Sequence, residues 1–134
     1  MKVPHINFSV EGAGVIKEKV LADSVFELVV HAEPTEQEFP LEITAVVNGA
    51  VTRGDWVKEL LCGPGDSNQP VKFEFQATDM PGASIRIIIG IRYRAVVVDQ
   101  SVNVLDVVRF HPGLGQSLKW ESQLNLNTVP QLLG

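Results

Sequence analysis

Apolar and polar residues alternate through three consecutive stretches of residues 71–108. Successive side chains of a β-strand point to opposite faces, so this period of two places the apolar set on one side of a sheet. Three such strands joined by tight turns predict an antiparallel meander with one buried face. The predicted buried set comprises Val71, Phe73, Phe75, Ala77, Ile85, Ile87, Ile89, Ile91, Tyr93, Val96, Val98, Val102 and Val104.

The same alternation predicts further strands in the first half of the chain, near residues 6–10, 25–33 and 41–47. Residues 15–21 form a weaker run with charged residues in its middle, which suits an exposed edge strand. Asn48 and Gly49 predict a hairpin turn, because both residue types accept positive φ. For residues 55–61 the pattern allows either a short helix capped by Asp55 or a strand.

These patterns predict an all-β fold with seven to eight short strands and no long helix. We expect a two-sheet antiparallel sandwich, immunoglobulin-like or fibronectin-like, with a small closed barrel as the alternative. The expected domain organisation is a sandwich over residues 1–108, followed by residues 109–134 as a linker and a C-terminal strand or tail.

Composition restricts the classes of partner. The formal net charge of −5 disfavours binding to a phosphate backbone, so we expect no nucleic-acid partner. No run approaches about 18 consecutive apolar residues, so we expect no membrane partner. The one cysteine, Cys62, cannot form an internal disulfide, and the chain begins without a signal-peptide pattern. A cytoplasmic location is therefore the expectation.

The sequence contains no catalytic motif and gives no reason to assign catalytic, cofactor-binding or metal-binding residues. Cys62 precedes Gly-Pro-Gly and is predicted to be a small buried hydrophobic residue. A hydrolase with Cys62 as its nucleophile is the third hypothesis for function. Glu33, Glu36 and Glu38 share one loop, for which a solvated acidic loop is favoured over a calcium site. Trp56 is predicted to lie in the core.

The C-terminal segment is where the sequence suggests a contact surface. Leu118, Trp120, Leu124 and Leu126 are predicted to share one face of an extended segment and to form a protein interface. The face could be covered by the domain's own sheet edge, by the edge of a second copy or by a neighbouring domain. Pairing with a sheet edge is favoured, and the linker length allows a homodimer by strand exchange.

From Trp56 onward the chain reads W-x-x-x-L, then V-K-F-E-F-Q-A, P-G, I-R-I-I-I-G-I-R-Y-R and V-V-V-D-Q-S-V-N-V. This pattern resembles the immunoglobulin-like β-sandwich accessory domains of bacterial multidomain proteins, which stand beside CHAT, von Willebrand A or trypsin-like protease domains. The resemblance implies no catalytic residues.

Taken together, these features predict a non-enzymatic module. We expect a sandwich that mediates protein–protein or interdomain contacts in a bacterial signalling or defence protein, without a cofactor. The alternative is a module that binds carbohydrate or another ligand.

Overall fold

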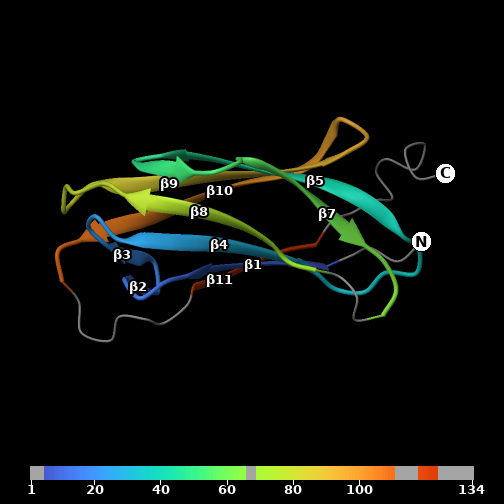
Figure 1. Ribbon diagram of the computed structural model, residues 1–134, viewed down its shortest axis with the longest axis horizontal. Coiled ribbons are helices and arrows are strands. Elements are labelled where there is room, and N and C mark those ends of the chain that lie inside the picture. Colours follow the sequence, from blue (N-terminus) through green and yellow to red (C-terminus); the bar gives the residue numbers. More distant parts are fainter. Residues whose placement is uncertain (1–4, 66–68, 111–117, 124–134) are drawn as a thin grey trace.

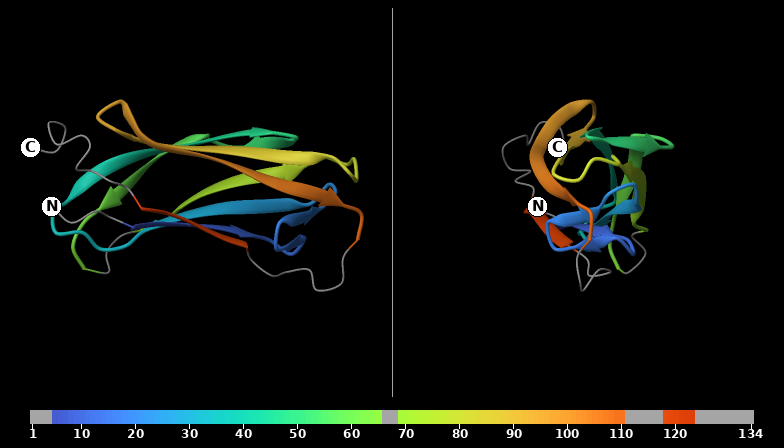
Figure 2. Two further views of the ribbon diagram at one scale, coloured as in Figure 1. Left: turned by 180° about the vertical axis from the view of Figure 1, so that it is seen from behind. Right: turned by 90° about the vertical axis from the view of Figure 1, so that its left-hand side faces the viewer.

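The computed structural model of this chain describes residues 5–65 and 69–110, together with the backbone of residues 118–123. These residues form an elongated β protein with two layers (Figures 1 and 2). In this part of the chain there is no helix long and apolar enough to cross a membrane. The expected all-β class and two-sheet arrangement are confirmed.

The described residues form eleven strands, and the strands beyond the expected seven or eight are short ones such as β2, β3 and β6. Sheet A has the order β11-β1-β4-β8-β6, and sheet B has the order β2-β3-β10-β9-β5-β7. The bounds in sheet A are β1 His5–Glu11, β4 Val25–Ala32, β6 Ala50–Arg53, β8 Val71–Ala77 and β11 Leu118–Gln123. Those in sheet B are β2 Val15–Ile16, β3 Lys19–Leu21, β5 Phe39–Asn48, β7 Val57–Cys62, β9 Ser84–Tyr93 and β10 Val96–Val108.

The core lies between the two sheets. On β1, β4, β8 and β9 the alternating apolar side chains point into it, as the sequence predicts. Phe26 and Phe75, on neighbouring strands of sheet A, have ring centroids 5.5 Å apart. Ile87 and Ile89 of sheet B are fully or almost fully buried. Each such side chain stabilises the folded chain by about 1.5–3 kcal/mol through its removal from water.

For the strands near the sheet edges, the structure agrees with only some of the predictions made from the sequence. The run at residues 15–21 divides into β2 and β3, and β2 is an edge strand as expected. The ambiguous run near Asp55 is a strand, β7, and not a helix. The sandwich is not wholly antiparallel, because β3 pairs in parallel with β10, with Val20 opposite Val107.

The hairpin predicted at Asn48 and Gly49 is wrong. The chain passes there from β5 in sheet B to β6 in sheet A, where Thr52 pairs with Phe75 of β8. Gly49 has a φ of 88°, and a Cβ on it would lie 2.4 Å from the carbonyl oxygen of Ser84. Glycine is therefore required for a close backbone crossing between sheets, and not for a tight turn.

The predicted burial of Val102 and Val104 on β10 is also wrong, although Val98 does pack against the core. Val102 and Val104 are 57% and 47% exposed, whereas Leu105 and Val107 are buried. The register of β10 is shifted by a bulge between Val97 and Asp99, and further along Leu105 pairs with buried Ile85 of β9. Because a shift of one residue exchanges the two faces of a strand, Val102 and Val104 point outward.

Candidate functional site

The chemical groups singled out in the sequence do not form a reaction centre within the described residues. Cys62 is fully buried on β7, and burial raises the pKa of its thiol to about 12, which disfavours the nucleophilic thiolate. No group of three or more His, Cys, Asp and Glu side chains in this part of the chain could hold a metal ion. The loop carboxylates Glu33, Glu36 and Glu38 are exposed.

The predicted C-terminal interface falls largely outside what the structure describes. Leu118 and Trp120 belong to β11, whose backbone pairs antiparallel with β1 so that Leu118 lies opposite Val10. Leu124 and Leu126 lie outside the described residues. The tail thus reaches the edge of its own sheet A, and its role as an interface stays a prediction.

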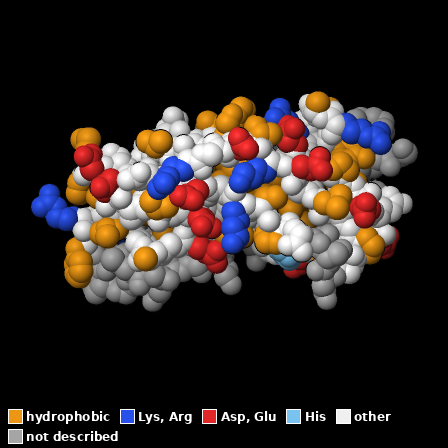
Figure 3. All heavy atoms as spheres, viewed as in Figure 1, with side chains coloured by type: hydrophobic (Ala, Val, Ile, Leu, Met, Phe, Trp, Pro, Cys, Tyr) orange, Lys and Arg blue, Asp and Glu red, His pale blue; other side chains and the backbone are white. Residues whose placement is uncertain are grey.

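The outer face of sheet A is charged along its middle, as is usual for an antiparallel sheet with one side in water, although the row of Val25, Gln76 and Val51 at one end exposes two valines. A row across its strands contains Glu27, Glu74 and Arg53, with the Nε of Arg53 3.4 Å from a carboxylate oxygen of Glu74. Figure 3 shows acidic and basic side chains gathered over the side formed by β4 and β8.

The outer face of sheet B is apolar at its centre. Val46 of β5, Ile88 of β9 and Val102 of β10 lie in one row across three adjacent strands. Val46 is 43% exposed, and Val104 lies one row further along β10. We call this surface the sheet B outer face; it comprises Glu42, Thr44, Val46, Asn48, Trp56, Arg86, Ile88, Gly90, Arg92, Val97, Gln100, Val102 and Val104.

In the middle of β10 the usual placement of apolar side chains inward and polar side chains outward is inverted. Ser101 and Asn103 pair with buried Ile89 and Ile87 and therefore share their inward side, where the Nδ2 of Asn103 donates to the Oγ of Ser101 over 3.0 Å. The neighbouring Val102 points to solvent. Over residues 101–104 the strand thus places polar side chains inward and apolar ones outward, the reverse of a half-buried strand.

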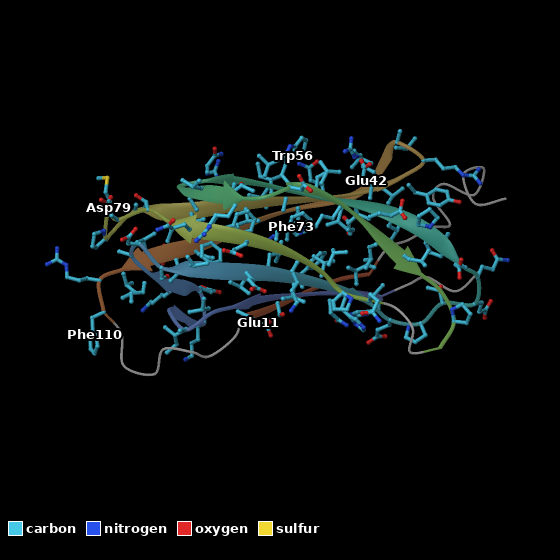
Figure 4. The ribbon with its side chains drawn as sticks, in the orientation of Figure 1. Glu11, Glu42, Trp56, Phe73, Asp79 and Phe110 are labelled. Carbon is cyan, nitrogen blue, oxygen red and sulfur yellow. The ribbon has the colours of Figure 1, made fainter. Side chains whose placement is uncertain are left out.

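Trp56 lies on the same outer face. The prediction that it is buried in the core is wrong. It is 51% exposed and precedes β7, where its carbonyl oxygen accepts a 2.9 Å hydrogen bond from the amide of Ala45. Figure 4 shows Trp56 and Glu42 on the outer side of sheet B, whereas Phe73 lies between the sheets.

A hollow of about 230 Å³ opens beside Trp56. Gly90 belongs to its lining, and Thr44 lies so close that a Cβ at position 90 would be 2.6 Å from its Oγ1. The hollow is lined by Thr44, Trp56, Ile88, Gly90, Arg92 and Gln100, among others. A second hollow, of about 430 Å³, lies along Val46, Gly54 and Trp56, so the indole borders both.

Charged groups stand at the two ends of the apolar centre. Arg92 forms an ion pair with Glu42, which lies opposite it on β5. The Nε of Arg92 is buried and has no hydrogen-bond partner. Arg86, exposed between Asn48 and Val104, marks the opposite end. The surface therefore combines an apolar centre with a charged rim, the usual composition of a protein-binding patch.

One sequence signal could have indicated this face. Residues 87–89 are three consecutive isoleucines and residues 96–98 three consecutive valines, and such runs are typical of strands covered on both faces.

No known family model matches this chain, and no curated protein matches it significantly. The fold and the surface define a two-sheet β protein with one apolar outer face.

Proposed function

We propose that this chain is a non-catalytic β-sandwich module that binds another protein through the sheet B outer face. The observation that carries the proposal is the contrast between the two outer faces, with Val102 and Val104 exposed on β10 above polar inward neighbours. Exposed apolar patches with polar rims mark interaction sites, because water leaves them at a gain in free energy.

The finer architecture and setting belong to the same proposal. We propose an immunoglobulin-like or fibronectin-like sandwich, serving as a cytoplasmic accessory domain of a bacterial signalling or defence protein. The support is the resemblance carried by the strand pattern after Trp56.

The proposal is tested by photocrosslinking from matched positions on the two outer faces. p-Benzoylphenylalanine replaces Val102 of sheet B in one variant and Val25 of sheet A, which is 39% exposed, in the other. We expect a discrete protein adduct from position 102 alone, identified by mass spectrometry, whose binding to the purified chain is lost on Val46→Lys and kept on Val25→Lys. Equal adducts from both positions, or none from either, would refute the proposal.

A ligand-binding module is the second candidate, favoured by one observation: Trp56 is half-exposed beside a hollow that also presents Thr44, Arg92 and Gln100. An indole beside polar groups can stack on a sugar ring. Titration with a panel of oligosaccharides, followed by tryptophan fluorescence, tests it. Binding that Trp56→Ala abolishes supports this candidate, and no change across the panel removes it.

A further inference from the structure

We infer that the partner of the sheet B outer face is a second copy of this chain, bound face to face with its strands antiparallel. The inference rests on the proposed function and names its partner. It starts from β9, where every second residue faces outward in the order Arg86, Ile88, Gly90 and Arg92. An isoleucine therefore stands beside a position that has no side chain.

Consider a two-fold axis that lies in the interface plane, perpendicular to the strands, and passes above Ile89. Rotation about this axis makes the outward residues of β9 complementary to those of the second copy. It places Ile88 over the partner's Gly90, where the hollow offers room for an aliphatic side chain. On β5 the same axis passes above Ala45, the cross-strand neighbour of Ile89. Val46 then lies over the partner's Thr44. Sheets stacked about 10 Å apart bring such side chains into contact.

The third strand, β10, obeys the same symmetry. Val104 pairs with Arg86 and Val97 pairs with Arg92, so the axis sets Val104 over the partner's Val97. Both valines are about half-exposed in the single chain. The apolar residues at opposite ends of β10 thus cover one another.

Trp56 lies beside the axis, because its carbonyl oxygen is bonded to the amide of Ala45. The two indoles of the dimer therefore approach each other at its centre. Aromatic pairs at 4.5–7 Å contribute about 0.5–1.5 kcal/mol beyond the burial of their area.

The charged rim is compatible with this arrangement. Asn48 lies over the partner's Glu42, so an amide donor meets a carboxylate. Arg86 lies opposite the ion pair of Arg92 and Glu42, whose charges sum to zero. The axis thus sets Arg86 over the partner's Arg92, and the carboxylate of Glu42 offsets this contact between like charges.

The size of the surface predicts a weak dimer. The three strands β5, β9 and β10, about 4.8 Å apart, and four residue rows about 6.8 Å apart cover roughly 400 Å² on each copy, to which Trp56 adds beside β5. The total of about 800–1,000 Å² is below the usual range for a stable specific interface, so we expect a dissociation constant in the micromolar range or weaker.

Sedimentation equilibrium of the full chain gives the first test. We expect a concentration-dependent rise from 14.7 kDa toward twice that mass. Val46→Lys should weaken association roughly tenfold or more, because it buries an ammonium group at the centre, whereas Val25→Lys on sheet A should leave it unchanged. A chain that stays monomeric up to millimolar concentration overturns the inference.

Site-specific crosslinking gives the second test and fixes the orientation. Val104→Cys and Val97→Cys chains are treated with a short bismaleimide, separately and as an equal mixture; buried Cys62 resists the reagent. We expect covalent dimers in the mixture alone, since equivalent positions lie about 20 Å apart across an antiparallel interface. Equal crosslinking of Val104→Cys by itself overturns the arrangement.

The two proposals can fail separately. If the chain is monomeric but its position 102 photocrosslinks a different protein, the surface remains a protein-binding site and the second copy is excluded. If neither the chain itself nor another protein is captured from position 102, both proposals fail.

Discussion

Individual residues of this chain hold backbone conformations that their side chains do not favour, and the clearest case is the hairpin between β9 and β10. Tyr93 pairs with Val96, and the two residues between them, Arg94 and Ala95, have φ values of 48° and 65°. Positive φ costs an ordinary residue about 1–2 kcal/mol. A two-residue hairpin turn requires it, because that twist matches the flanking strands.

Ala95→Gly should therefore stabilise the protein. Glycine adopts positive φ without steric cost, and we expect a gain of about 0.5–1 kcal/mol in urea unfolding, after the larger entropy of the unfolded glycine is subtracted. The control is Ala50→Gly in β6, where φ is not positive and a loss of about 0.5–1 kcal/mol is expected. A loss at both positions would show that the turn is not strained.

The burial of Cys62 predicts how the stability of the folded chain depends on pH. Burial raises the pKa of its thiol from 9.0 to about 12, so the folded chain holds the proton that the unfolded chain releases. The resulting stability is complete below about pH 9 and is lost as the pH rises toward about 12.

Comparison with Cys62→Ala isolates this effect from other alkaline titrations. The stability difference between wild type and variant should be smaller at about pH 10.5 than at about pH 7. Native Cys62 should also react with a thiol reagent far more slowly than in urea. A constant difference between the two pH values would contradict the burial of the thiol.

At the scale of elements, β10 decides which face of sheet B is buried. Leu105 is buried and Val102 is exposed, so the two should respond differently to substitution. We expect Leu105→Ala to cost about 2–5 kcal/mol of unfolding free energy, since it leaves a cavity. Val102→Ala should cost under about 1 kcal/mol in the monomer. Similar urea midpoints for the two variants would show that the strand has the other register.

The last strand makes a separate prediction. β11 is the edge of sheet A and protects the backbone of β1, with Trp120 opposite Phe8. A chain that ends at Phe110 should melt several degrees lower, because six residues of strand pairing are lost and β1 becomes an exposed edge. Circular dichroism measures the melting. An unchanged melting temperature would mean that β11 adds no stability.

At the scale of the whole molecule, distant parts of the chain are neighbours. β1 pairs with β11, and β3 pairs with β10, so closing the sandwich requires the two ends of the sequence to meet. Folds dominated by such pairings refold slowly, because loop-closure entropy is lost before the contacts form. We expect the main refolding phase after dilution from urea to take milliseconds to seconds. Stopped-flow fluorescence measures it, and a microsecond phase of full amplitude would contradict this topology.

Alternation in the sequence predicts the all-β class and the buried faces of β1, β4, β8 and β9, and it favours two sheets over a closed barrel. The physical reason is local: alternation at a period of two assigns a face wherever only one face is apolar. The same local reasoning places a buried, unreactive thiol at Cys62.

The features on which the proposed site depends follow from long-range pairing. Residues 96–108 carry apolar side chains on both faces, so alternation assigned Val102 and Val104 to the wrong face, and pairing of Leu105 with Ile85 and of Val107 with Val20 sets the buried one. Asn48 and Gly49 have the composition of a hairpin turn, yet the close approach of Ser84 sets a crossing between sheets there. Trp56 is exposed because β7 begins after it, a boundary that depends on pairing with β5 across the chain.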